Sequence, residues 1–275
     1  MPTPEIKKGF IIENREGYNA LKALNYSGAK ELLKSPAHYH YSLTAERKET
    51  TALRVGSLTH AMILEPHVVS KKFIISPAFD RRTKDGKTAY EEFLKESIGR
   101  TVVTEDEWDL SLSVSQSMAG IVSKLKVNFV ATELMFVTEI CGVTFKCAID
   151  AIGDDGYIYD LKTAEDASPN GFLRAARNYH YNLQAYIYRM AYEMAFGERM
   201  QGFRFIVAEK EEPNLGACYQ LGPEIMTSAS FDFDKIVETY NKCSLLDEWP
   251  GYPDEVQTID FGSKQTTESK SINFA

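Results

Sequence analysis

Asp160 and Lys162 are separated by one residue, so in a β-strand both side chains would lie on one face and Leu161 on the other. The pattern alone is weak, because an acidic residue stands two positions before a lysine five times in the chain. Only this occurrence lies in an apolar, strand-like segment, where burying two charges is costly unless they have a function.

Asp150 lies ten residues before Asp160, at the end of another apolar segment. A hairpin with the three-residue loop Asp154-Asp155-Gly156 would place Asp150 opposite Asp160, and a glycine suits the left-handed third position of such a loop. Two neighbouring carboxylates repel each other unless a cation lies between them, and oxygen ligands suit Mg²⁺, for which Mn²⁺ can substitute. The sequence therefore predicts a magnesium site on Asp150, Asp160 and Lys162.

Two alternatives stay open. A two-residue turn at Asp155-Gly156 would pair Asp150 with Leu161 and move Asp160 to the other face. Asp150 could also be a surface acid at a strand end, with Asp160 and Lys162 as an exposed ion pair. The apolar neighbours favour the metal site; they are Ala148, Ile149, Ile152, Ile158, Tyr159 and Leu161.

The surrounding elements follow from periodicity and from turn residues. We expect an antiparallel meander of strands at 133–140, 143–152 and 157–161, and further strands at 203–209 and 217–221. We expect helices at 27–35 (Ser27 as N-cap, Pro36 after the last turn), 54–65, within 80–97, 105–126, 171–196 and 230–246. Helices flanking a central mixed sheet make a three-layer α/β/α fold.

Composition sets broad limits on the class of protein. The 275 residues suit a single domain over 1–255, with a mainly helical part at 25–130, the sheet and its helices at 131–252 and a polar, flexible tail at 256–275. We expect no membrane span and no signal peptide, and the scattered cysteines indicate a reducing cytoplasm. The net charge of −8 counts mildly against nucleic-acid binding, although a basic groove can lie on an acidic body.

The Asp150 and Asp160-Leu161-Lys162 arrangement resembles the PD-(D/E)xK nuclease superfamily, with Ile149 in the place of the proline. The chain from about 25 to 252 is similar, more specifically, to the exodeoxyribonuclease VIII (RecE-type) family of phage and prophage nucleases. Four segments carry this second resemblance: Tyr26–Tyr39 with its Ser-Pro turn, Gly56–Pro66 with a Gly-x-x-x-His pattern, Tyr181–Tyr188 with a Gln-x-x-x-Tyr pattern, and Trp249–Tyr252. The resemblance implies a restriction-endonuclease-like core with an N-terminal helical elaboration.

The resemblance also assigns roles to residues. His60 would bind metal together with Asp150, Asp160 and the Leu161 carbonyl, and Lys162 would orient the attacking water. Gln184 and Tyr188, four residues apart on one helix face, would orient the site and contact the DNA backbone.

Each of these assignments has a simpler structural alternative. His60 could be a satisfied core histidine, and Gln184 and Tyr188 could serve helix packing. Glu133 could join the acidic set, but we expect it at a surface strand position. Further candidates for DNA contacts, in loops that could equally be solvated, are Ser27, Ser35, Arg81, Arg82, Lys84 and Lys87.

The activity implied by the resemblance is a Mg²⁺-dependent 5′→3′ exonuclease on double-stranded DNA ends, leaving 3′ single-stranded tails for homologous recombination. A homo-oligomeric ring, a single-strand annealing partner and a place in the cytoplasm (that of a bacterial host if the protein is phage-encoded) are implied in the same way. Two alternatives remain: a structure-specific or single-strand nuclease on the same fold, and a non-catalytic DNA-binding recombination scaffold.

Overall fold

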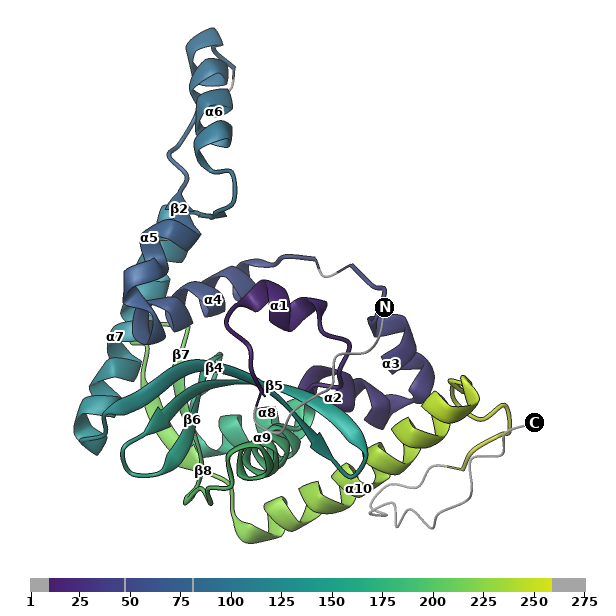
Figure 1. The fold of residues 1–275 in the computed structure, drawn as a ribbon. Coiled ribbons are helices and arrows are strands. Elements are labelled where there is room, and N and C mark those ends of the chain that lie inside the picture. Colours follow the sequence, from purple (N-terminus) through teal and green to yellow (C-terminus); the bar gives the residue numbers. More distant parts are fainter. Residues whose placement is uncertain (1–9, 47, 81, 259–275) are drawn as a thin grey trace.

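The computed structural model describes residues 10–46, 48–80 and 82–258, and it is built around a six-stranded sheet (Figure 1). The strand order is β1-β4-β5-β6-β7-β8. β6 and β7 are parallel and the other neighbours are antiparallel, so the sheet is mixed as predicted. The strand bounds are β1 Phe10–Ile11, β4 Phe129–Ile140, β5 Val143–Gly153, β6 Tyr157–Ala164, β7 Gly202–Glu209 and β8 Gly216–Gln220.

Two tight hairpins fix the register of β4, β5 and β6. The β4–β5 loop has two residues, Cys141 and Gly142, both with positive φ (50° and 76°), which matches the twist of the flanking strands. The β5–β6 loop is the three-residue loop expected from the sequence, with Gly156 at φ 77°. Its ladder pairs Ile152 with Ile158, which confirms the predicted register and excludes the two-residue turn.

Helices cover both faces of the sheet and bury an apolar core on each, so the predicted α/β/α layering is confirmed (Figure 1). One face packs against α2 (Tyr26–Lys34), α8 (Pro169–Tyr179), α9 (Tyr181–Phe196) and α10 (Pro223–Leu246). The other face packs against α4 (Thr51–Leu64) and α7 (Glu105–Leu125), with α1 (Arg15–Ala20) over β4.

The single helix predicted over 171–196 is wrong, because the structure has two helices that meet at His180. His180 adopts the left-handed conformation (φ 55°) and ends α8. Phe172 in α8 and Leu183 in α9 belong to the same core, so the apolar periodicity continues across the break and conceals it.

The expected capping of α2 also needs correction. Asn25 is its N-cap and accepts the Gly28 N–H at 2.8 Å, so Ser27 lies inside the first turn. Pro36 does not simply follow this helix. It begins α3 (Pro36–Ser42), whose N-cap is Ser35.

An arm extends from the N-terminal half of the chain, away from the sheet (Figure 1). β2 (Phe73–Ile75) and β3 (Thr101–Val103) pair in parallel at its base, and α6 (Lys84–Glu96) forms its outer part. A 3₁₀ turn at Pro66–Val68 and the short helix α5 (Val69–Lys72) lead into it. The sequence did not predict the β2–β3 pair.

Among the helices of the described residues, none is long and apolar enough to cross a membrane.

Candidate active site

The candidate site lies where β5 and β6 separate. The two strands pair only at Ala151–Tyr159 and Ile152–Ile158, after which β6 continues its ladder with β7. Asp150 and Asp160 are the next residues in this register. In a continued ladder a backbone carbonyl of β5 would accept the Leu161 N–H of β6. Here the Asp150 carboxylate replaces that carbonyl, since its Oδ2 accepts the Leu161 N–H at 2.8 Å.

Glu133 joins these two acids from the neighbouring strand. The pairs Leu134–Ile149 and Thr132–Ala151 flank it, so Glu133 lies opposite Asp150. Its left-handed backbone (φ 49°) interrupts the ladder at this point, an uncommon conformation for a non-glycine residue. The expectation of a surface position is wrong, since only 18% of the Glu133 side chain is exposed.

Helix α4 brings His60 to the same place. Among the described residues, His60, Glu133 and Asp150 offer ligand atoms that all lie within 4.8 Å of one another. His60 Nδ1 lies 3.5 Å from Asp150 Oδ2, and its Nε2 lies 3.0 Å from the Leu161 carbonyl oxygen. Arg15 of α1, whose side chain is half-exposed, donates to Glu133 Oε2 at 2.7 Å.

The electrostatics of this group fit a divalent cation. Burial and the Asp160 charge raise the pKa of Asp150 to about 8, and burial with the Asp150 charge raises the pKa of Glu133. Burial also lowers the pKa of His60, which favours the neutral imidazole that metals require. Carboxylates that resist ionisation because they crowd one another are stabilised by a hard cation with oxygen ligands.

Asp160 and Lys162 form a second group on the α9 side. Asp160 is 2% exposed, and its Oδ2 accepts from Gln184 Nε2 at 2.5 Å while its Oδ1 is ion-paired with the Lys162 ammonium. Burial alone would lower the pKa of Lys162, but the Asp160 and Asp150 charges raise it overall, so the ammonium stays charged. The ammonium also lies over the Tyr181 ring, 4.9 Å from its centroid.

The structure therefore brings the predicted site residues together, but the role of Asp160 differs from the predicted one. Asp160 lies outside the group of three ligand atoms, and its carboxylate is engaged by Gln184 and Lys162. Gln184 holds Asp160 as expected of an orienting residue. Tyr188 is 7% exposed and packs near Phe203, so burial leaves neither Gln184 nor Tyr188 placed to contact a DNA backbone directly.

The residues expected to contact DNA do not share one surface. Ser35 is buried and caps α3, with its Oγ 2.7 Å from His38 Nδ1, so its hydroxyl is engaged within the fold. Ser27 is half-buried in the first turn of α2. Arg82, Lys84 and Lys87 belong to the arm, which projects away from the sheet (Figure 1), and Arg82 pairs with Asp80 at 3.1 Å. Arg81 lies outside the described residues.

Comparison with known proteins agrees with this geometry. The family model described as a PDDEXK-like domain of unknown function (DUF3799) matches residues 25–261. The chain belongs to this family. It therefore has a PD-(D/E)xK nuclease fold, and divalent metals are the cofactors of such nucleases.

Solved structures agree at the level of the fold. A candidate exonuclease from Eubacterium rectale, solved at 2.19 Å resolution, is 14% identical with a TM-score of 0.57, over 88% of this chain and 94% of that one. SSO0001 (12% identity, TM-score 0.26, 75% of this chain and 81% of that one covered) and LHK-Exo in complex with dAMP (10%, 0.29, 72% and 94%) are more distant in structure. A search of curated proteins found no match to the chain.

Proposed function

We propose that this PDDEXK-domain protein is a Mg²⁺-dependent deoxyribonuclease that degrades duplex DNA from 5′ ends and leaves 3′ single-stranded tails for homologous recombination. One observation carries the nuclease assignment. Glu133, Asp150 and Asp160 lie in a row across three adjacent strands, with His60 beside Glu133 and Asp150 and with Lys162 paired to Asp160. The finer assignment to 5′→3′ resection rests on the resemblance to the RecE-type family.

The grouping of metal-ligand atoms in the site supports hydrolysis of a phosphodiester. His60, Glu133 and Asp150 would hold the cation, which lowers the pKa of bound water and so supplies the nucleophile. The Leu161 N–H fixes the orientation of the Asp150 carboxylate, and the nearby Leu161 carbonyl offers a further oxygen ligand.

Lys162 provides the positive charge that phosphoryl chemistry needs. Its ammonium would stabilise negative charge on the phosphate oxygens in the transition state. Asp160 holds the ammonium in place and Gln184 holds Asp160, so the catalytic lysine is pre-organised by two buried partners.

The proposal extends to partners. We infer that the protein acts on double-stranded DNA ends as a homo-oligomeric ring and hands its 3′ tail to a single-strand annealing protein, as the resemblance implies. Because the net charge of the chain is −8, this proposal requires a locally basic surface along which the DNA binds.

The experiment uses a linear duplex labelled at the 5′ or the 3′ end of one strand, a closed circle of the same sequence, and Mg²⁺ or EDTA. We expect labelled mononucleotide to appear first from the 5′ label, no cut in the circle and no product in EDTA. Earlier release from the 3′ label would overturn the polarity, and cutting of the circle would indicate an endonuclease. No product from any substrate would indicate a non-catalytic scaffold.

A further inference from the structure

The turn between α8 and α9 presents an exposed aromatic ring next to the candidate site. Tyr179 ends α8 and is 54% exposed. The left-handed His180 that follows it brings Tyr179 and Tyr181 together, with ring centroids 5.7 Å apart and planes 25° apart. Tyr181 in turn lies under the Lys162 ammonium, so the row Tyr179–Tyr181–Lys162 leads from the surface to the site.

This row is held rigidly. The Tyr26 hydroxyl of α2 donates to the Tyr179 backbone carbonyl. Tyr181 continues the stack inward, onto Phe172 (6.0 Å, 29°) and Phe205 (5.5 Å, 25°). The Tyr179 ring is thus the exposed end of an aromatic stack, and its backbone is tied to α2.

Basic side chains lie beside the same turn. Lys30 and Lys34 follow Tyr26 by four and eight residues in α2, on the helix face that contacts the turn through the Tyr26 hydroxyl, and after burial their charges help to lower the pKa of His180. Asp232 of α10 also acts on His180, in the opposite direction, and Lys34 pairs with Glu31 at 2.9 Å. An exposed ring flanked by lysines is the arrangement that binds single-stranded nucleic acid, since the base stacks and the phosphates meet the cations.

We propose that the exposed Tyr179 ring is the stacking surface for an unpaired nucleobase of the DNA strand that enters the active site, with Lys30 and Lys34 facing the strand's phosphates. The inference rests on the proposed nuclease function and adds that the substrate strand is unpaired where it meets the protein. Stacking is tolerant of sequence because every base has an aromatic face, so the surface would favour no particular base.

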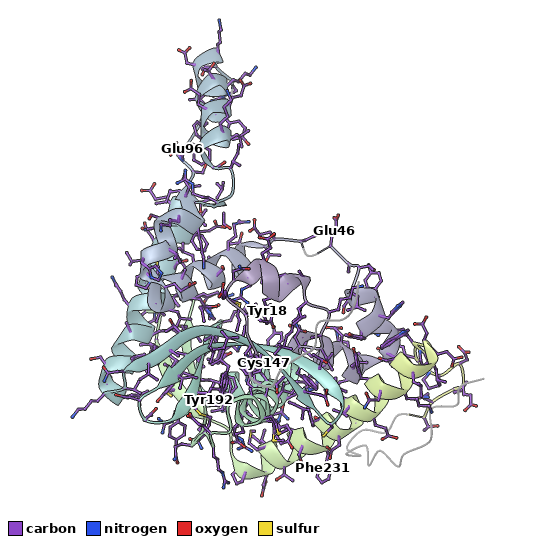
Figure 2. The ribbon with its side chains drawn as sticks, viewed as in Figure 1. Tyr18, Glu46, Glu96, Cys147, Tyr192 and Phe231 are labelled. Carbon is purple, nitrogen blue, oxygen red and sulfur yellow. The ribbon has the colours of Figure 1, made fainter. Side chains whose placement is uncertain are left out.

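The test uses the full-length chain and a short single-stranded oligonucleotide with 2-aminopurine at its end, in EDTA so that it stays intact. A second oligonucleotide carries an abasic nucleotide at the same end. The variants are Tyr179→Phe, which keeps the ring, and Tyr179→Leu, which keeps apolar bulk without it. Phe231→Leu is the matched control, because Phe231 is an aromatic residue that is 69% exposed on α10 and is not part of the row Tyr179–Tyr181–Lys162; Figure 2 shows it at the lower edge of the view. Thermal unfolding verifies that each variant is folded.

We expect wild type, Tyr179→Phe and Phe231→Leu to quench the 2-aminopurine fluorescence and to bind the base-bearing oligonucleotide about tenfold more tightly than the abasic one. Tyr179→Leu should lose both the quenching and the preference. The inference is overturned if wild type does not distinguish the two oligonucleotides, if Tyr179→Leu behaves as wild type, or if Tyr179→Phe fails as completely as Tyr179→Leu. Base-dependent binding in a chain that releases no nucleotides would instead overturn the nuclease proposal and leave the stacking surface standing.

Discussion

The carboxylate of Asp150 accepts the backbone N–H of Leu161 at 2.8 Å, at the point where β5 and β6 stop pairing. A side chain thus replaces a ladder hydrogen bond, and the strands separate around it without leaving that buried donor unsatisfied. The same contact ties a candidate metal ligand to the strand that carries Asp160 and Lys162. The site is therefore part of the sheet, with no loop interposed.

Asp150→Asn should separate this structural role from the metal-binding role. The amide oxygen can still accept the Leu161 N–H, but the negative charge is lost. We expect nuclease activity to fall at least a hundredfold, while stability in EDTA stays equal or rises because the cost of burying an ionisable carboxyl beside Asp160 is removed. Thermal unfolding and a nucleotide-release assay measure the two effects. A large loss of stability in EDTA would show that the charge itself supports the fold.

The raised pKa of Asp150 predicts how stability depends on pH. In the unfolded chain this carboxyl ionises near pH 3.9, whereas in the folded protein it ionises near 8. The unfolded state therefore binds fewer protons between these values, and the Asp150 contribution to the free energy of unfolding is lost as pH rises from about 4 through about 8. Denaturant unfolding of wild type in EDTA should show this decline more strongly than Asp150→Asn does. Identical pH profiles would contradict it.

Magnesium should bind more tightly at higher pH, because the cation requires the ionised carboxylates and displaces their protons. We expect the Mg²⁺-induced rise in melting temperature to grow between pH 6 and pH 9. In Asp150→Asn, the Mg²⁺-induced rise in melting temperature should increase less with pH. A Mg²⁺ effect that is constant with pH would place the ion away from Asp150 and Glu133.

Glu133→Gln tests the ligand that the sequence assigned to the surface. Removing one of the three grouped ligands should weaken Mg²⁺ binding about tenfold or more, measured by calorimetry. Glu139→Gln, an exposed acid on the same strand, is the matched control and should bind as wild type does. Equal loss in both variants would indicate a general charge effect rather than a ligand.

Gly156→Ala tests whether the hairpin loop sets the site. Gly156 has φ 77°, and a side chain there should cost about 1 kcal/mol of stability. Gly99→Ala introduces the same backbone strain (φ 78°) in the arm. We expect Gly156→Ala to lose at least as much stability as Gly99→Ala, because the added Cβ would also lie 3.1 Å from Gln201 Cγ, and we expect a loss of activity in Gly156→Ala alone. Denaturant unfolding measures the stability of both variants. Full activity in Gly156→Ala would show that the positions of Asp150 and Asp160 do not depend on this turn.

The sequence was informative where local rules decide the structure. The glycine of the loop at 154–156 specified the hairpin, and the hairpin specified that Asp150 and Asp160 are neighbours. The apolar periodicity likewise predicted most helices and the layered fold. The break at His180 was not predicted, because the two flanking helices bury apolar residues at helical spacing in the same core.

Glu133 was considered for the acidic set but expected at the surface, for a different reason. Its place follows from the two-residue loop at Cys141-Gly142, which sets Glu133 opposite Asp150, so the register was available from the sequence. Its left-handed backbone and the contact with Arg15 depend on tertiary packing of α1 and could not be predicted. The burial of Ser35 and the projection of the arm also depend on packing between distant segments.

The most direct test of the central claim is single-turnover cleavage of a linear duplex by wild type, Asp160→Asn and Lys162→Met, each with Mg²⁺ and with EDTA. Lys162→Met should lower the cleavage rate by about 10²- to 10³-fold while leaving the fold intact, because it removes a positive charge that would stabilise the transition state. Asp160→Asn should be at least as impaired, and wild type in EDTA should be inactive. Cleavage by both variants at the wild-type rate, or by wild type in EDTA, would contradict a metal-dependent nuclease site at Asp150, Asp160 and Lys162.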